Sequence, residues 1–209
     1  MRLILVMLAV LVVLLANEAW WRWRKTHGEF SRKFVHVTVG SFVAFWPFFL
    51  SWRQIEILSL AFAVCVAISK ALNIFTALHS VQRPTWGEFC FALAVGLVAL
   101  ITHDKWIYMA AVLQMSLADG LAAVVGVRFG RRSSYIFLNR TKSIVGTATF
   151  FVTSLLILIA YEHFSGAHPA AALIVGVAVF ASLLENVSVN GLDNLLVPVV
   201  VALLLRAIS

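Results

Sequence analysis

Three carboxylates in or beside apolar stretches are the residues of this sequence best suited to chemistry. Asp119 lies within the apolar run Met115–Val127, while Glu185 and Asp193 lie on either side of an Asn-Gly turn. An ionisable group in an apolar segment is costly unless it is paired or bound to a cation. Because carboxylate oxygens are hard ligands of the kind that Mg²⁺ prefers, we interpret Asp119, Glu185 and Asp193 as metal-ligand candidates. The alternatives are a structural ion pair for Asp119 and a water-exposed polar turn for the other two.

Glycines and arginines follow Asp119 along the chain. Gly126 and Gly130 lie seven and eleven residues after Asp119, which places all three on one stripe of a helix. A stripe without side chains lets a backbone or a ligand approach closely. Guanidinium groups bind phosphate oxygens as a fork, and this segment ends with three of them: Arg128, Arg131 and Arg132. The alternative is tight helix packing followed by a basic loop.

A second cationic segment opens the next apolar run and contains Lys142, Ser143, Gly146 and Thr147. Free backbone N–H groups and the helix dipole make such a helix N-terminus suited to anions. The glycine spacing differs from that of a Walker A loop, so this segment is not that nucleotide motif. An ordinary Ser or Thr helix cap is the alternative.

Further polar groups precede the Asp119 segment, around Glu29, Arg32, Lys33 and His36. In a helix, Glu29, Lys33 and His36 would share a face, because offsets of four and seven residues return to the same side. The alternative is a basic anchor beside a membrane, with His36 as a packing residue.

Two weaker candidates are short turns. Arg83 and Glu88 flank a Pro-Thr-Trp-Gly turn, in which Glu88 would open a helix with a favourable negative charge. Asn194 directly follows Asp193. A simple connection between helices would explain both equally well.

Together these groups are what phosphoryl transfer requires. Carboxylates hold Mg²⁺, and lysines and arginines neutralise the phosphates, so that little covalent chemistry is asked of the protein. The apolar runs beside the polar segments would admit a lipid sideways. The residues alone therefore indicate a membrane enzyme that handles a nucleotide or phosphate together with a lipid.

The elements that must position these residues are membrane helices. The 209 residues are 62% hydrophobic and 12% charged, whereas a soluble domain keeps about a quarter of its residues charged. Apolar runs near the ~20 residues needed to cross a bilayer recur along the chain. We expect one all-α domain over residues 1–209, a polytopic helical bundle of about seven or eight transmembrane helices. The expected spans are approximately 2–20, 34–51, 55–78, 88–102, 105–127, 143–161, 168–186 and 192–207.

The distribution of basic residues predicts the orientation. Most lysines and arginines fall in the connections after the first, third, fifth and seventh runs, which places these connections in the cytoplasm and both termini outside. The first run is interpreted as a retained span rather than a signal peptide, because its downstream flank is the more basic. The net charge of +7 lies in short loops, so nucleic acid is not expected as a partner. The prediction is a multi-pass protein of the cell membrane with its polar segments facing the cytoplasm.

These motifs resemble the polyprenol kinase family, which includes dolichol kinase and phytol or farnesol kinase and is related to phosphatidate cytidylyltransferase. The resemblance runs from about Glu29 to Pro198. The matching pieces are Arg32-Lys33-x-x-His36, Arg83-x-x-Trp-Gly87-Glu88, Asp119 with Gly126 and Gly130, Lys142-Ser143-x-x-Gly146-Thr147, and Glu185 with Asp193-Asn194-x-x-x-Pro198.

One position separates the subgroups of this family. Dolichol kinases and cytidylyltransferases carry a Glu where this chain has Val145. Phytol-kinase-like members tend to have a small apolar residue there, so the chain looks more like them.

The resemblance implies a CTP-dependent, Mg²⁺-requiring kinase that converts an isoprenoid alcohol into its monophosphate, with ATP as the other candidate donor. Asp119 would organise Mg²⁺ and the triphosphate, with Asp193 and Glu185 as secondary ligands. The residues expected to hold phosphates are Arg32, Lys33, Arg128, Arg131, Arg132 and Lys142, and His36 would act as a base or hydroxyl positioner. The expected partners are the alcohol, the nucleoside triphosphate and membrane lipids, and a homodimer is left open. The alternatives are a cytidylyltransferase-like CDP-lipid synthase and a non-enzymatic transporter or subunit.

Overall fold

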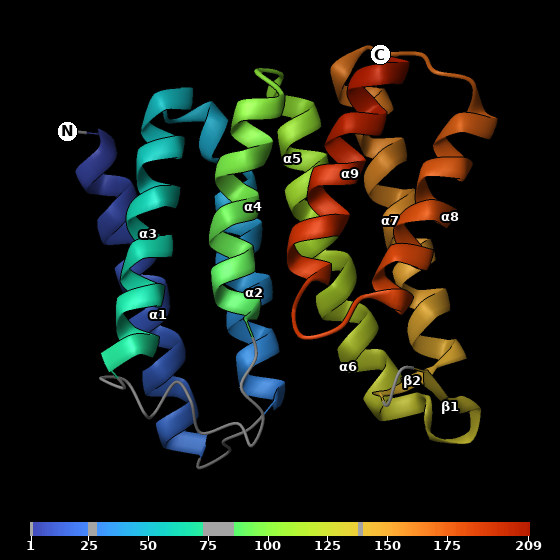
Figure 1. Cartoon of the computed structure of the whole chain (residues 1–209), viewed down its shortest axis with the longest axis horizontal. Coiled ribbons are helices and arrows are strands. Elements are labelled where there is room, and N and C mark those ends of the chain that lie inside the picture. Colours follow the sequence, from blue (N-terminus) through green and yellow to red (C-terminus); the bar gives the residue numbers. More distant parts are fainter. Residues whose placement is uncertain (1, 25–28, 73–85, 138–139) are drawn as a thin grey trace.

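The computed structural model describes residues 2–24, 29–72, 86–137 and 140–209. Within the first three helices some side chains, including those of Glu29 and Arg32, lie outside the described part. The chain forms a bundle of helices that stand side by side (Figure 1). Its main helices are α1 (Arg2–Arg24), α2 (Glu29–Ala44), α3 (Trp52–Leu72), α4 (Gly87–Ile101), α5 (Lys105–Leu113), α6 (Asp119–Phe129), α7 (Ile144–Ser165), α8 (Ala171–Val187) and α9 (Asp193–Ile208).

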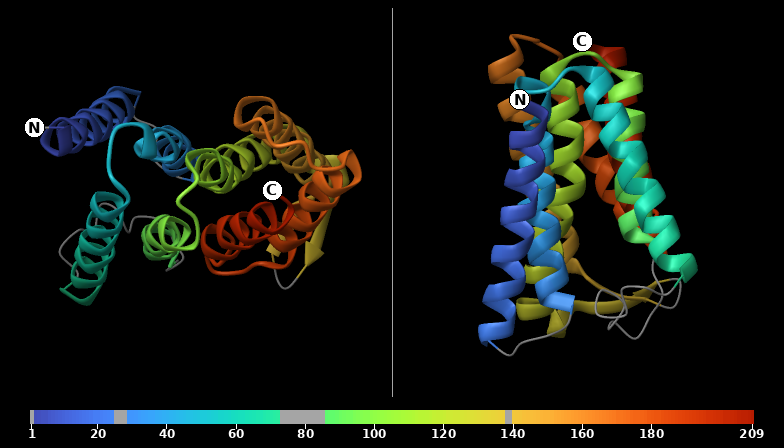
Figure 2. Two further views of the ribbon diagram at one scale, coloured as in Figure 1. Left: turned by 90° about the horizontal axis from the view of Figure 1, so that it is seen from above. Right: turned by 90° about the vertical axis from the view of Figure 1, so that its left-hand side faces the viewer.

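The bundle has two distinct ends. Seen from above, α1 and α3 lie at one side of the bundle and α7 and α8 at the other (Figure 2). The start of α1 and the end of α9 lie at the upper end, whereas a small β-hairpin lies at the lower end (Figure 1). The hairpin and these two chain ends therefore lie at opposite ends of the bundle, while the orientation in a membrane stays a prediction.

The helices follow the predicted apolar runs closely, and the all-α architecture is confirmed. A difference appears in the second run, which was expected to extend to residue 51. There α2 ends at Ala44 and a 3-10 turn, η1 (Trp46–Phe48), follows it. Pro47 lies in this turn, and proline lacks the N–H group that a continuing α-helix would need.

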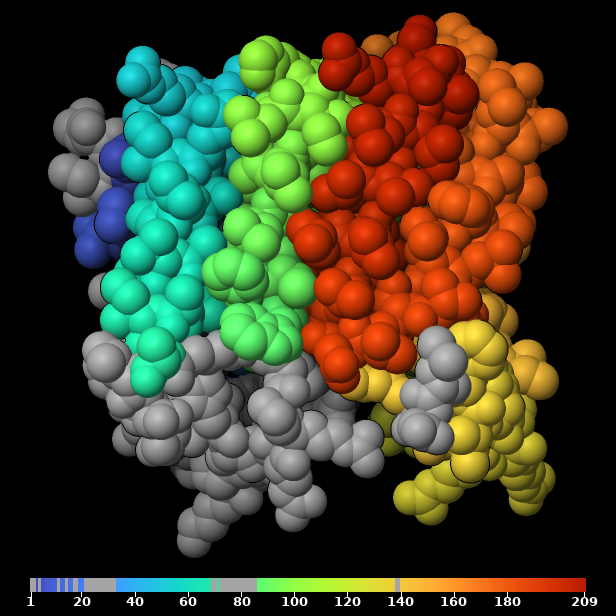
Figure 3. Space-filling model, in the orientation of Figure 1, coloured from blue at the N-terminus to red at the C-terminus, as the bar shows by residue number. Residues whose placement is uncertain are grey.

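Two segments of the described chain are long and apolar enough to cross a membrane by length and composition, Lys105–Phe129 and Ile144–Ser165. Two shorter apolar helices are Gly87–Ile101 and Ala171–Val187. Figure 3 shows α3, α4, α9 and α8 side by side across one face of the molecule, and each exposes a leucine: Leu60, Leu100, Leu203 and Leu183 respectively. Such extensive apolar exposure is typical of a surface that meets a membrane or a partner. The number of membrane crossings stays a prediction.

The segment Lys105–Phe129 contains an irregularity that the sequence did not predict. A π-helical turn, η2 (Gln114–Ala118), separates α5 from α6. A π turn carries an additional residue and therefore changes the face on which the following residues lie. Asp119 comes directly after this turn, so η2 determines the direction in which its carboxylate points.

The connection between α6 and α7 was expected to be a loop and is instead partly a β-hairpin. After a 3-10 turn, η3 (Arg131–Ser133), strand β1 (Ser134–Phe137) pairs antiparallel with β2 (Arg140–Ser143). Tyr, Ile and Phe follow one another in β1, and these residue types favour strands. The hairpin projects beyond the helices (Figure 3).

Candidate functional site

A partly buried ion pair between α2 and α6 forms the first part of the site. The ammonium group of Lys33 donates a hydrogen bond to the Asp119 carboxylate, and Asp119 is only 5% exposed. The two helices approach closely because Gly120 has no side chain: a Cβ there would lie 2.0 Å from Cγ2 of Val37. An ion pair of Asp119, the alternative interpretation, is therefore present, and its partner is a lysine from another helix.

His36 lies one turn after Lys33 on α2. Its Nε2 lies 3.2 Å from the carbonyl oxygen of Met115 in η2, and its ring meets Phe91 of α4 edge-on. Because a carbonyl oxygen can only accept, Nε2 carries the hydrogen in this contact. His36 thus ties α2 to the π turn that precedes Asp119.

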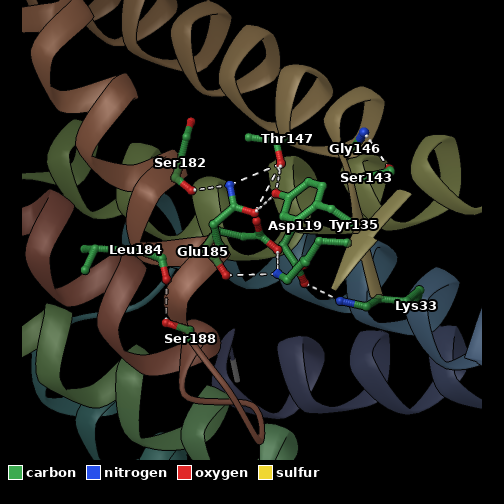
Figure 4. A network of polar contacts seen from close by, with 12 residues as sticks. Lys33, Asp119, Tyr135, Ser143, Gly146, Thr147, Ser182, Leu184, Glu185 and Ser188 are labelled. Carbon is green, nitrogen blue, oxygen red and sulfur yellow. Dashed lines mark hydrogen bonds and ion pairs between the residues drawn. The ribbon is translucent and has the colours of Figure 1, made fainter. Parts of the chain in front are cut away.

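A second ion pair joins the hairpin to the end of α8. Lys142, at the end of the hairpin, donates to the Glu185 carboxylate and also to the Glu185 carbonyl oxygen at 3.0 Å. Figure 4 shows Glu185 close to the Lys33–Asp119 pair. Both lysine ammonium groups are therefore held by carboxylates from separate helices.

The two pairs belong to one electrostatic cluster, which Asp193 joins from the start of α9. The charge of Asp119 interacts with those of Lys33, His36 and Lys142. Asp193 interacts with Asp119, Lys33 and Lys142, and Glu185 with Asp119 and Asp193. With both lysines and all three carboxylates ionised, the cluster carries one surplus negative charge. The structure thus brings Asp119, Lys142 and Asp193 together, while their chemical roles remain predictions.

The glycines of the predicted stripe are explained by helix packing, the alternative interpretation. A Cβ at Gly130 would lie 2.3 Å from the Ser143 Oγ, and one at Gly146 would lie 3.2 Å from the carbonyl oxygen of Ala122. A Cβ at Gly126 would lie 3.3 Å from the Gly146 Cα. The Ser143 hydroxyl in turn caps α7 by accepting from the Gly146 N–H at 3.0 Å. These residues bring the hairpin and α6 against α7, and a direct contact with phosphate stays a prediction for them.

The three arginines that follow Asp119 lie apart from the cluster. Arg128, Arg131 and Arg132 are exposed at the end of α6 and in η3, and the Arg128 guanidinium lies over the ring of Phe129. Within the described part of the chain, no hydrogen bond or ion pair joins them to the three carboxylates. Their phosphate-binding role stays a prediction.

The turns around Glu88 and Asn194 meet each other. The Asn194 side chain donates to the Gly87 carbonyl at 3.0 Å, and the Trp86 N–H donates to the Asn190 carbonyl at 3.2 Å. A Cβ at Gly191 would lie 2.5 Å from the Gly87 Cα. The α8–α9 connection is thus seated on the N-terminus of α4, whose first turn contains Glu88.

Of the remaining candidates, Arg83 lies outside the described residues, and of Glu29 and Arg32 only the position in α2 is described.

The sequence did not single out Tyr135 and Asn186. The Tyr135 hydroxyl donates to the Asn186 side-chain oxygen at 2.7 Å and lies 3.2 Å from the Thr147 hydroxyl. Tyr135 was missed because its segment was treated as a loop, where no side-chain direction is expected.

The carboxylates of the cluster suit a metal ion that arrives bound to substrate phosphates better than a metal site formed by protein ligands alone. No three His, Cys, Asp or Glu side chains among the described residues are close enough to hold a metal ion. Mg²⁺ is usually held by one or two carboxylates, with waters and substrate phosphates completing its shell. Asp119 and Asp193 would supply two such carboxylates, whereas Glu185 bonds Lys142 through both its carboxylate and its carbonyl group.

Comparison with known proteins decides the family. No protein-family model matches the sequence, and no solved structure is similar to it. The sequence is similar to a phytol kinase from Synechocystis sp., with 34% identity over 200 residues that cover 92% of this chain and 84% of the relative. The chain belongs to the phytol kinase family.

A second relative agrees with this assignment. A probable chloroplastic phytol kinase from Triticum aestivum is 28% identical over 84% of this chain and 66% of the relative. As a member of the phytol kinase family, the chain is a phosphotransferase. The non-enzymatic alternative, a transporter or a packing subunit, is thereby set aside. The buried lysine–carboxylate cluster is the part of this phytol kinase family member whose chemistry suits phosphoryl transfer.

Proposed function

We propose that the chain transfers the terminal phosphoryl group of a nucleoside triphosphate, with CTP as the preferred donor, to the hydroxyl of an isoprenoid alcohol. The names of the two relatives support the alcohol. The observation that carries the proposal is the convergence of Lys33, Lys142, Asp119, Glu185 and Asp193 into one partly buried charged cluster. Buried charges of both signs are costly to assemble, so such a cluster points to a ligand that uses both.

Asp119 and Asp193 are assigned to Mg²⁺, because they are the two carboxylates of the cluster that do not bond to Lys142 of the hairpin. When bound, the metal would neutralise charge on the phosphate oxygens. Lys33 and Lys142 are assigned to the phosphates, because an ammonium group released from a carboxylate can donate to an anionic oxygen instead. The alcohol oxygen would bond to the terminal phosphorus while the bond to the nucleoside diphosphate breaks, giving a prenyl monophosphate and the diphosphate.

His36 is assigned to positioning. Its Nε2 hydrogen is directed at the Met115 carbonyl, so this nitrogen does not accept the alcohol proton in that arrangement. A strong base is not needed, because the phosphoryl transition state is loose and proton removal comes late. His36 instead keeps α2 and η2 together, and with them Lys33 and Asp119.

The location is proposed to be the cytoplasmic face of a cell membrane. The apolar segments Lys105–Phe129 and Ile144–Ser165 support membrane insertion. Lys142 of the charged cluster lies in the hairpin, whose connection between α6 and α7 is rich in arginine and lysine, and basic connections favour the cytoplasm. An apolar alcohol could then reach the cluster from within the lipid.

Product analysis tests the proposal. Purified protein would be incubated with Mg²⁺ and terminally labelled CTP or ATP, together with phytol, farnesol or geranylgeraniol. We expect label in a prenyl monophosphate, CDP as the second product and slower transfer from ATP. Pyrophosphate and a CDP-lipid, formed from phosphatidate, would instead support the cytidylyltransferase alternative. If no isoprenoid alcohol became labelled from any nucleotide, the proposed function would be wrong.

A further inference from the structure

The hairpin is attached to α8 through two neighbouring side chains of one strand pair. Tyr135 of β1 lies directly opposite Lys142 of β2, and opposite residues of an antiparallel pair share a face of the sheet. Their partners are consecutive in α8: Lys142 bonds to Glu185, and Tyr135 donates to Asn186 at 2.7 Å. Figure 4 shows Tyr135 and Glu185 in the same network of polar contacts.

Thr147, one turn into α7, completes this attachment. Its hydroxyl lies 3.2 Å from that of Tyr135 and accepts from the Asn186 amide nitrogen at 3.1 Å. The same nitrogen lies 3.2 Å from the Ser182 carbonyl. Three side chains from β1, α7 and α8 therefore satisfy one another at the edge of the charged cluster.

The hairpin depends on this attachment for its position. A two-stranded hairpin is marginally stable on its own. In β1, only Tyr135 is partly buried, while its other residues are exposed. Strand β2 has an additional contact at its far end, where the Arg140 guanidinium donates to the Asn190 side chain at 2.7 Å. The Tyr135 hydroxyl is therefore the side-chain anchor of β1.

We propose that Tyr135, acting through Asn186 and Thr147, is a positioning residue that holds the ammonium group of Lys142 where it meets the nucleotide phosphates. This inference rests on the proposed function. A lysine side chain has a long flexible stem, so the place of its charge depends on a fixed backbone. Strand β1 fixes that backbone, since Tyr135 and Lys142 are paired across the hairpin. On this reading Glu185 is a partner that orients Lys142 rather than a metal ligand.

The inference predicts a selective change in nucleotide binding. In Tyr135→Phe the ring stays and only the hydroxyl is lost, so the hairpin should remain folded but less fixed. We expect the KM for CTP to rise about tenfold, the size of one lost pre-organised contact. The KM for the alcohol should stay unchanged, because Lys142 is assigned to the phosphates. A purely structural defect would lower the amount of active enzyme, and with it kcat, without this selective rise.

Tyr161, whose hydroxyl also bonds to a side chain, provides the control. The Tyr161 hydroxyl bonds to Ser209 at the opposite end of α7, so Tyr161→Phe removes a buried hydroxyl far from the cluster. We expect Tyr161→Phe to leave the KM for CTP unchanged. Asn186→Leu is the second test variant, because it removes the oxygen that accepts from Tyr135 and should reproduce the Tyr135→Phe result. It also keeps the test open if Tyr135→Phe does not fold.

A double-mutant comparison tests whether Tyr135 affects nucleotide binding through Lys142 or through other residues. Binding of the Mg²⁺ complex of CTP would be measured for Lys142→Met, Tyr135→Phe and the double variant. If Tyr135 acts through Lys142, adding Tyr135→Phe to Lys142→Met should change the Kd less than twofold, because neighbouring contributions do not add. Additive losses, or an unchanged KM for CTP in both Tyr135→Phe and Asn186→Leu, would overturn the inference. A wild-type protein that labels no alcohol would instead sink the proposed function itself.

Discussion

At the residue scale, the structure changes the interpretation of two carboxylates. Asp119 was the leading candidate, and its partner is Lys33, 86 residues earlier in the chain. Glu185 was a candidate metal ligand, and it holds Lys142 with both its side chain and its carbonyl group. Each of the two ion pairs is therefore neutral by itself, so a magnesium–nucleotide complex would have to exchange partners with both pairs. In that exchange Mg²⁺ would bind the carboxylates, and the phosphates would bind the lysines.

Asp119→Asn tests the leading assignment. The amide keeps the size of the side chain but removes the charge that would bind Mg²⁺, so we expect phosphoryl transfer to fall at least about a hundredfold while the protein still folds. Asp104→Asn is the matched control, because Asp104 caps α5 at an exposed site far along the same segment, and asparagine also caps helices well. Activity would be measured by label transfer and folding by size-exclusion chromatography in detergent. An Asp119→Asn protein with near-normal activity would contradict the assignment.

Lys33→Met tests whether the first ion pair is more than structural. Removing one partner of a buried pair leaves the other charge uncompensated, at a cost of about 3–5 kcal/mol. We therefore expect Lys33→Met to lower the thermal unfolding temperature, and Lys33→Met with Asp119→Asn to recover much of that loss. Activity should stay low in the double variant. Recovery of both stability and transfer in the double variant would show that the pair serves the fold alone.

At the element scale, irregular segments place the candidate site. The π turn η2 directs Asp119, the hairpin carries Lys142, and the α8–α9 connection rests on the start of α4. In that connection Asn190 and Gly191 both have positive φ, at 56° and 88°. This backbone shape is easy for glycine and unfavourable for other residues, so the Asn-Gly pair determines how Glu185 and Asp193 are joined.

Gly191→Ala tests this connection. A Cβ there would lie 2.5 Å from the backbone of Gly87 in a left-handed conformation, so we expect a loss of about 1–3 kcal/mol of stability and reduced activity. Gly176→Ala is the control, because a Cβ at Gly176 meets nothing within 4 Å and alanine favours a helix by about 0.5–1 kcal/mol. Thermal unfolding in detergent would measure both. Equal stability of the two variants would show that the close seating on α4 is not required.

At the scale of the whole molecule, the two ends of the bundle carry different features. The hairpin, which carries Lys142, lies at one end, and the start of α1 and the end of α9 lie at the other (Figure 1). Apolar side chains are exposed along the helices between the two ends. If the hairpin end faces the cytoplasm, as we propose, a water-soluble nucleotide would approach from that end and a membrane-dissolved alcohol from between the helices.

Cysteine labelling tests this orientation. In a Cys65→Ser background, which removes the exposed native cysteine, Ile136→Cys would mark the hairpin and His168→Cys the α7–α8 connection. Both positions are exposed. We expect a membrane-impermeant thiol reagent added outside intact cells to label His168→Cys only, and Ile136→Cys to react after the membrane is opened. The reverse pattern would contradict the predicted cytoplasmic face.

The sequence by itself determined the helical architecture and the kinds of residues in the candidate site. Helix extents depend on local hydrogen bonds and on continuous apolar runs, so α4 (Gly87–Ile101) and α9 (Asp193–Ile208) could be predicted to within a residue or two. The same local reasoning missed the π turn and the hairpin, because neither has an apolar period of its own. It also failed to tell which glycines pack against a neighbouring helix.

Only the tertiary structure decided which side chains pair with one another. Lys142 and Glu185 are 43 residues apart, and Tyr135 and Asn186 are 51 apart. Such contacts depend on how whole helices pack and rotate against one another, which composition and spacing do not specify. That packing brings Asp193 beside Asp119, pairs Glu185 with Lys142, and anchors the hairpin to α8 through Tyr135.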